Sequence, residues 1–209
     1  MALTFNGSNN TISGIASGGL NADAVGIDDL NATGTASAST YLRGDNAWAA
    51  ISAGITEADV WRVTAHTTSN GGGLILTANW ERCDTDGFGK LGTGMTESSG
   101  VFTFPSTGIW EINFFGYCHD TTNSHTTGGH ISPTVDGGST YTTAASSYFS
   151  VPNVSTYSYG SFFQTHIMDI TDTSTHKTKF YVYSSGDVTW EGTTSANALC
   201  AVFKKLGDT

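Results

Sequence analysis

From Val60 onward, short runs of β-prone residues alternate with clusters of turn-forming residues. Thr, Tyr, Phe, Val and Ile dominate the runs, whereas Gly, Asn, Asp and Ser fill the clusters, as between short antiparallel strands. Short strands at this spacing predict an all-β fold, a two-sheet antiparallel jelly-roll sandwich. We expect strands near residues 60–67, 73–81, 101–104, 108–119, 129–136, 140–149, 158–171, 176–185, 187–191 and 197–206. We expect turns at residues 69–73, 84–87, 136–139 and 184–187.

Residues 1–59 differ from the rest because they contain few large apolar side chains, separated by Gly, Ala, Ser, Asn and Thr. So little apolar surface does not offset the entropy of ordering the chain. We therefore expect two parts: an extended N-terminal segment over residues 1–59, ordered only against other copies or another protein, and a jelly-roll domain over residues 60–209. Within the segment, residues 20–33 have the spacing of one short helix, and residues 34–40 are expected to be an extended linker.

The charge of the chain excludes two classes of partner. It has 8 Lys and Arg against 18 Asp and Glu, a net charge of -10. An acidic chain has no phosphate-binding footprint and is repelled by anionic lipid, so we expect no nucleic-acid partner and no docking on membranes. No apolar run reaches the roughly 18 residues that a membrane span needs, so membrane insertion is not expected. The N-terminus also lacks the pattern of a signal peptide.

Three cysteines, Cys83, Cys118 and Cys200, are present. An odd number without close pairing argues against a disulfide framework. We expect three free thiols that are buried as small apolar residues, as in a protein that folds in a reducing cytoplasm.

Polar residues that suggest chemistry are scattered. His119, His125 and His130 lie with Asp120 around one expected loop, but their spacing matches no short metal-ligand motif, and solvated histidines are the simpler interpretation. Asp84 and Asp86 precede Gly87 without the terminal acid of a calcium loop, so we expect a β-turn.

Two further features have alternative interpretations. Arg43-Gly44-Asp45 matches an adhesion tripeptide, but a turn is the simpler interpretation. No nucleophile elbow or pair of catalytic acids stands out, so we predict no enzyme, no catalytic residue, no metal and no cofactor.

An aromatic-rich stretch follows residue 140. Residues at alternating positions are expected in the core, whereas loop positions are candidates for stacking on sugars. The candidate receptor contacts are His125 and Tyr157. The stretch comprises Tyr141, Tyr148, Phe149, Tyr157, Tyr159, Phe162 and Phe163.

One motif carries a family resemblance. Residues 100–112, Gly-Val-Phe-Thr-Phe-Pro-Ser-Thr-Gly-Ile-Trp-Glu-Ile, resemble the signature of the trimeric jelly rolls of complement component 1q heads and tumour necrosis factor. In this pattern Pro105 ends one strand and Gly108 opens the next. The expected buried residues are Phe102, Phe104, Ile109 and Trp110. Residues 76–80, 167–182 and 198–206 match the same domain in order, so the resemblance spans about residues 60–206 and implies a homotrimer.

A second resemblance concerns residues 34–48, Gly-Thr-Ala-Ser-Ala-Ser-Thr-Tyr-Leu-Arg-Gly-Asp-Asn-Ala-Trp. They are similar to a segment of bacteriophage tail-fibre and virion proteins, in which Gly usually stands at the position of Asn46. Asn also tolerates a positive φ, so the turn is expected to persist. Residues 3–7 and 11–15 resemble the start of phage structural proteins.

Together the resemblances imply a non-enzymatic structural component of a phage virion, assembled in the host cytoplasm. The first interpretation is a homotrimeric tail fibre whose distal knob is a candidate binder of a host-surface glycan or protein. The alternative is a capsid decoration or head-fibre protein with a mechanical or weakly adhesive role. A bacterial surface adhesin is a third interpretation. The expected contacts with other virion proteins are Leu3, Phe5, Ile12 and Ile15, and the expected shaft and trimer contacts are Tyr41, Leu42 and Trp48.

Overall fold

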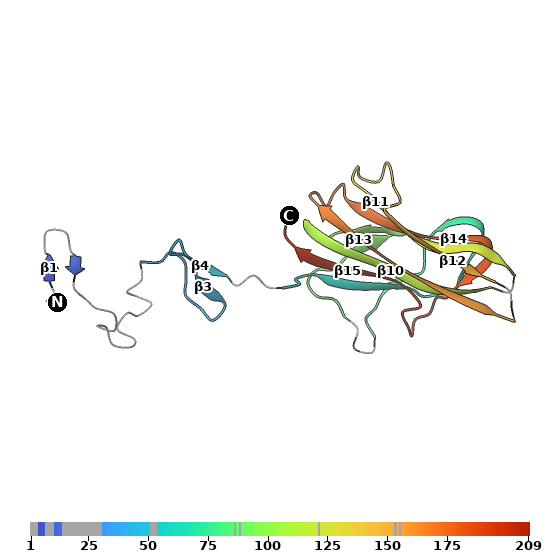
Figure 1. Ribbon diagram of the computed structural model, residues 1–209, viewed down its shortest axis with the longest axis horizontal. Helices are drawn as coiled ribbons and strands as arrows, with labels where there is room; N and C mark the ends of the chain where they lie inside the picture. The colour runs from blue at the N-terminus through green and yellow to red at the C-terminus, as the bar shows by residue number, and fades with distance from the viewer. Residues whose placement is uncertain are drawn as a thin grey trace. The chain divides into compact units, whose positions relative to one another are not determined.

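The computed structural model describes residues 4–6, 11–13, 31–50, 54–85, 87, 89–120, 122–152, 154 and 156–209 (Figure 1). The chain divides into two compact units, Met1–Ala53 and Gly54–Thr209. Strands and no helix are found in the described ranges, which confirms the all-β prediction. Most of the helix expected over residues 20–33 lies outside these ranges. Its described end is not helical, because Thr33 forms a parallel β-bridge with Ala47.

The first unit contains two small antiparallel pairs. β1 (Thr4–Asn6) pairs with β2 (Thr11–Ser13), and β3 (Thr40–Leu42) pairs with β4 (Trp48–Ala50). The turn between β3 and β4 closes through a hydrogen bond from Arg43 N to Ala47 O of 2.8 Å. Asn46 has a φ of 63°, so the asparagine adopts the backbone conformation expected of it.

The second unit is a jelly-roll sandwich of two antiparallel layers (Figure 1). The first, the β10 layer, contains in spatial order β7 (Trp80–Arg82), β5 (Ala58–Val63), β15 (Leu199–Gly207), β10 (Gly108–Asp120) and β13 (Ser158–Ile170). The second, the β14 layer, contains β6 (Thr67–Ile75), β14 (Lys177–Trp190), β11 (Ser124–Thr134) and β12 (Ala145–Val151), with β9 (Val101–Thr103) and β8 (Thr96–Ser98) beside the start of β14. The layers join where Cys118 and His119 of β10 pair with Trp190 and Thr189.

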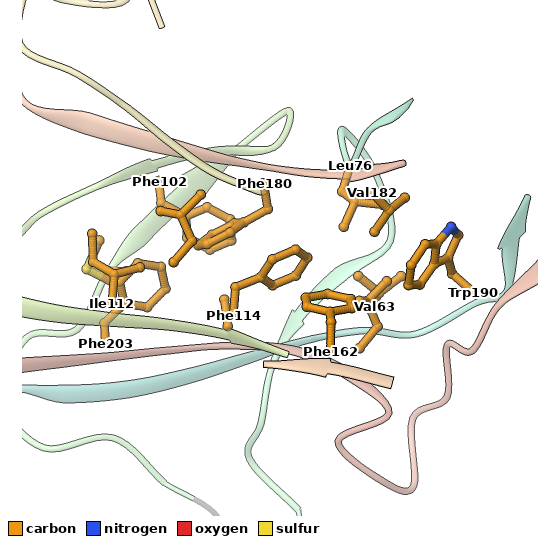
Figure 2. Packing of buried hydrophobic residues seen from close by; sticks show 14 of the residues in the cluster. Val63, Leu76, Phe102, Ile112, Phe114, Phe162, Phe180, Val182, Trp190 and Phe203 are labelled. Carbon is orange, nitrogen blue, oxygen red and sulfur yellow. The ribbon is translucent and has the colours of Figure 1, made fainter. Parts of the chain in front are cut away.

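The core lies between the two layers and is rich in aromatic rings (Figure 2). Phe114 of β10 contacts Phe180 of β14 with ring centroids 4.8 Å apart, and Phe102 contacts Phe203 at 5.2 Å. Because strand residues alternate between faces, every second residue of β10 and β14 enters this core. Each fully buried side chain of this size contributes about 1.5–3 kcal/mol to folding, so this layer of rings holds the sandwich together.

The motif at residues 100–112 forms the predicted turn between two core strands. β9 ends at Thr103, just before Pro105, and Gly108 opens β10 with a φ of 139°. Phe102, Phe104 and Trp110 are buried as expected. The expected burial of Ile109 is wrong: Trp110 takes the inward position, so its neighbour Ile109 points to the outer face and is only partly covered.

Two of the expected turns are wrong, because both segments lie in strands and these strands pair with each other. Residues 69–73 lie inside β6 and residues 184–187 lie inside β14. The register of this strand pair shifts between Ser184 and Asp187, so the two turn-like sequences form one irregularity in a continuous ladder. For the same reason the two strands expected at 176–185 and 187–191 are one strand. The turn expected at residues 136–139 is present and is held by Asp136, which accepts hydrogen bonds from Thr134 and Thr140.

A pair of glycines tests the packing around the motif. Gly100 and Gly137 have nearly equal positive φ values, 80° and 79°. A Cβ at Gly100 would lie 2.2 Å from the carbonyl oxygen of Leu76, whereas a Cβ at Gly137 would meet no atom within 4 Å. We expect Gly137→Ala to cost about 1–2 kcal/mol of unfolding free energy from its φ alone, and Gly100→Ala to cost clearly more. Urea unfolding of the full chain measures both, and equal losses would contradict the packing.

Candidate self-association face and other candidate sites

The outer face of the β10 layer carries large apolar side chains. Residues of β13 alternate, so Phe162 enters the core while Phe163 points outward. Tyr159, Phe163 and Ile167 share this outward face and are 65%, 62% and 60% exposed. Phe163 stands opposite Phe115 of β10, with the two rings stacked at 6.4 Å. We call this stripe the β13 face.

Polar groups border the β13 face. Ser161 and Thr165 lie between its apolar residues on the same side of β13. At one border, Lys204 Nζ of β15 donates a 2.8 Å hydrogen bond to Glu111 of β10, which lowers the pKa of that carboxyl. Single exposed apolar residues are normal on soluble proteins, but three large ones on one face of a single strand make this face a candidate interaction surface.

At the other end of the β13 face, three residues distant in sequence meet. His119 Nδ1 lies 2.5 Å from one carboxylate oxygen of Glu191, and His66 Nδ1 lies 3.1 Å from the other. The His119 ring also packs edge-on against Tyr157, with centroids 4.9 Å apart. No local sequence pattern indicates this cluster, because its members come from a loop, from β10 and from the residue that follows β14.

The histidines expected around one loop do not gather. His119 points to the cluster just described, whereas His130 lies on the outer face of the β14 layer beside Tyr148. His125 is exposed, and Asp120 is buried. In the part of the chain that the structure describes, no three His, Cys, Asp or Glu side chains are placed to hold a metal ion. Of the expected calcium-like turn, Asp86 lies outside the described residues.

The core interpretation of the aromatic stretch is correct only in part. Phe162 is buried, and Phe149 is partly buried against the core. It is wrong for the exposed residues, because a strand of a two-layer sandwich buries only one of its faces. These exposed strand residues are Tyr148, Tyr159 and Phe163. Tyr157, a candidate receptor contact, is 51% exposed beside His119.

The expected shaft contacts lie on the β3–β4 hairpin. Tyr41 and Leu42 are 49% and 39% exposed, and Trp48, opposite Leu42, is partly buried. In the turn, Arg43 Nε donates a 3.0 Å hydrogen bond to Asp45, so the two charged side chains of the adhesion-like tripeptide pair with each other. This pairing fits the turn interpretation.

The expected virion contacts are only partly described. Leu3 and Ile15 lie outside the described residues. Phe5 and Ile12 are opposite each other in the β1–β2 pair. The structure thus places the backbone of two of these four residues in one ladder.

The three cysteines are free and buried, as predicted. Burial raises the pKa of all three thiols, that of Cys118 to about 12. A thiol that stays protonated is a poor nucleophile, so the cysteines act here as small apolar residues.

Comparisons with known proteins support the fold. No protein-family model matches the chain, and no curated protein matches it. Among solved structures, the tumour necrosis factor Eiger from S. frugiperda superposes with a TM-score of 0.52 and 12% identity, covering 75% of this chain and 96% of that one. Murine APRIL superposes with a TM-score of 0.51 and 14% identity at pH 8.0, covering 72% of this chain and 98% of that one. These likenesses show a jelly roll of the tumour necrosis factor type.

The expectation that no segment spans a membrane can be compared with the structure for helices. None of the described residues belongs to a helix that is long and apolar enough to span a bilayer.

The thiols give a prediction about pH. An exposed thiol reacts faster as pH rises toward its usual pKa near 8.5. Because burial raises the pKa values of these thiols, their thiolate fraction stays small up to pH 9. We expect labelling of the folded chain with a disulfide reagent to be far slower than that of the unfolded chain at every pH from 7 to 9, and to rise without levelling off near pH 8.5. The chain unfolded in guanidinium provides the control and should label at all three cysteines. A native rate that equals the rate of the unfolded chain, or that levels off near pH 8.5, would contradict the burial.

Proposed function

We propose that this chain is a non-enzymatic structural protein of a phage virion, a homotrimer that assembles through the β13 face. The observation that carries the proposal is the stripe of Tyr159, Phe163 and Ile167, each at least 60% exposed on one chain. In this proposal residues 1–59 attach the jelly roll to the particle, and the jelly roll is the distal knob of a tail fibre.

The energetics favour self-association through the β13 face. Burying one large apolar side chain contributes about 1.5–3 kcal/mol, and each copy brings three such residues to the contact. Part of that gain offsets the freedom lost on association, so the stripe must be buried in the centre of the interface to hold three chains together. The resemblance of residues 100–112 to trimeric jelly rolls supports three copies around one axis, a closed cyclic arrangement.

The β3–β4 hairpin supports the virion part of the proposal. In a single chain Tyr41 and Leu42 remain 49% and 39% exposed, as expected of a segment that is completed by sister copies or by another virion protein. The hairpin turn lies within the segment that is similar to bacteriophage fibre proteins. The net charge of -10 favours solubility of a repetitive assembly.

A matched pair of variants tests the assembly. Phe163→Asp places a charge at the centre of the β13 face, whereas Val135→Asp places the same charge at an equally exposed position, 63% against 62%, outside that face. We expect the wild-type chain and Val135→Asp to sediment at three times the chain mass of 21.9 kDa, and Phe163→Asp to sediment as a monomer. A monomeric wild type, or a trimeric Phe163→Asp, would sink the assembly through this face.

Deletion of residues 1–20 tests attachment. We expect the shortened chain to form the same oligomer but to be absent from purified particles, because the attachment residues are lost. Normal incorporation would count against the proposal. In intact particles, tens of copies would support the tail fibre, whereas hundreds of copies would indicate the capsid decoration role.

A further inference from the structure

The outer face of the β14 layer carries a second aromatic group, formed by Tyr148 of β12, His130 of β11 and Tyr183 of β14. The His130 and Tyr183 rings are nearly parallel, at 19°, whereas the Tyr148 ring stands at 87° and 90° to them. The three centroids lie 5.4–6.5 Å apart. We call this right-angled arrangement the aromatic corner.

A hydrogen-bond contact holds two members of the corner together. The hydroxyl of Tyr148 lies 2.9 Å from His130 Nε2, within hydrogen-bond distance. Burial lowers the pKa of His130, so the imidazole is neutral at pH 7. Tyr148 is nevertheless 54% exposed, so the corner is both ordered by its own contacts and open to solvent.

Glycines on both sides leave space around Tyr183. In the ladder Tyr183 stands opposite Gly128 on β11 and opposite Gly73 on β6. A Cβ on Gly128 would lie 1.9 Å from the carbonyl oxygen of Ser147 and 3.0 Å from the Tyr148 ring, so a glycine here lets β12 approach closely and leaves room for the Tyr148 ring beside the strand. On the other side, a Cβ on Gly73 would lie 4.0 Å from the Tyr183 ring, so Gly73 leaves bare backbone beside that ring.

The chemistry around the corner is neutral. The row across the sheet reads Tyr148, Gly128, Tyr183 and Gly73, and the adjacent row reads Ser146, His130, Tyr181 and Ile75. Neither row contains a charged side chain at pH 7. The whole chain has a net charge of -10, which repels anionic ligands.

We infer that the aromatic corner binds a neutral saccharide. A sugar ring has an apolar C–H face, which suits the Tyr183 and His130 rings, and hydroxyl groups, which suit the tyrosine hydroxyls and Ser146. The corner lies on the layer opposite the β13 face, so both surfaces operate in one assembly. The inference rests on the proposed function because it names the host-surface ligand class of the knob, and it places that ligand away from Tyr157 and His125.

Saturation-transfer NMR on the full chain tests the inference. The probes are the methyl glycosides of glucose, galactose, mannose and N-acetylglucosamine, with N-acetylneuraminic acid as the anionic comparison. We expect at least one neutral glycoside to bind weakly and the anionic sugar not to bind. Several corners on one oligomer would strengthen such weak contacts on a surface. The absence of binding by all neutral glycosides, or binding of the anionic sugar alone, would overturn the inference.

Variants locate the site. Tyr148→Ala and Tyr183→Ala remove rings, and Gly73→Leu keeps both rings but places a side chain beside Tyr183, where only ordinary contact at 4.0 Å is expected. We expect each to weaken binding about tenfold, and the equally exposed Tyr157→Ala to leave binding unchanged. Loss of binding in Tyr157→Ala alone would overturn the location.

Sedimentation of the same samples separates the two proposals. If the variants keep the wild-type mass, a change in sugar binding reports on the corner alone. If the wild type is a monomer that still binds sugar through Tyr183, the assembly proposal fails while the saccharide site stands.

Discussion

The alternation of side chains along β10 and β13 is the constraint on which the rest of the structure depends. In β10, Trp110, Ile112 and Phe114 enter the core, and their neighbours point to the outside. Side chains of a strand alternate between its two faces, and only one face of each layer lies toward the core. Each residue that points into the core therefore places its neighbour on the outer surface. The apolar character of the outer residues therefore calls for an explanation beyond folding, and the proposed contact between copies is such an explanation.

The two layers of the sandwich present different surfaces. The β10 layer presents large apolar side chains in a stripe, which suits a permanent contact between identical chains. The β14 layer presents the aromatic corner among glycines and serines, which suits a small polar ligand that binds and dissociates. The layers share the ring-to-ring core of Phe102, Phe114 and Phe180, so a rigid body connects the two surfaces.

The fold was largely predictable from sequence because its main signals are local. The all-β class, the Pro105 and Gly108 turn, and the buried thiols follow from residue type and short-range pattern. It was harder to predict which face of a strand is buried. Phe162 and Phe163 are identical in chemistry, and only the partner strands decide which of them enters the core. The glycine-rich residues 69–73 look like a turn in isolation, yet they pair with β14, which lies more than a hundred residues later.

The candidate sites were less predictable, since they join residues that are distant in sequence. Nothing local links His66 or Glu191 to His119, or Tyr148 to Tyr183. Tyr41 and Leu42 could be proposed from the sequence because they belong to one contiguous segment, which the structure folds into one hairpin.

The most direct test of the central account is hydroxyl-radical footprinting of the wild-type chain over a range of concentrations. It compares Phe163 and Tyr159 with Tyr148 on the other layer. The account predicts that oxidation of Phe163 and Tyr159 is slow in the concentrated chain and rises on dilution, while oxidation of Tyr148 stays constant. Oxidation of Phe163 as fast as that of Tyr148 at every concentration would show that the β13 face is open to water, and would contradict the account.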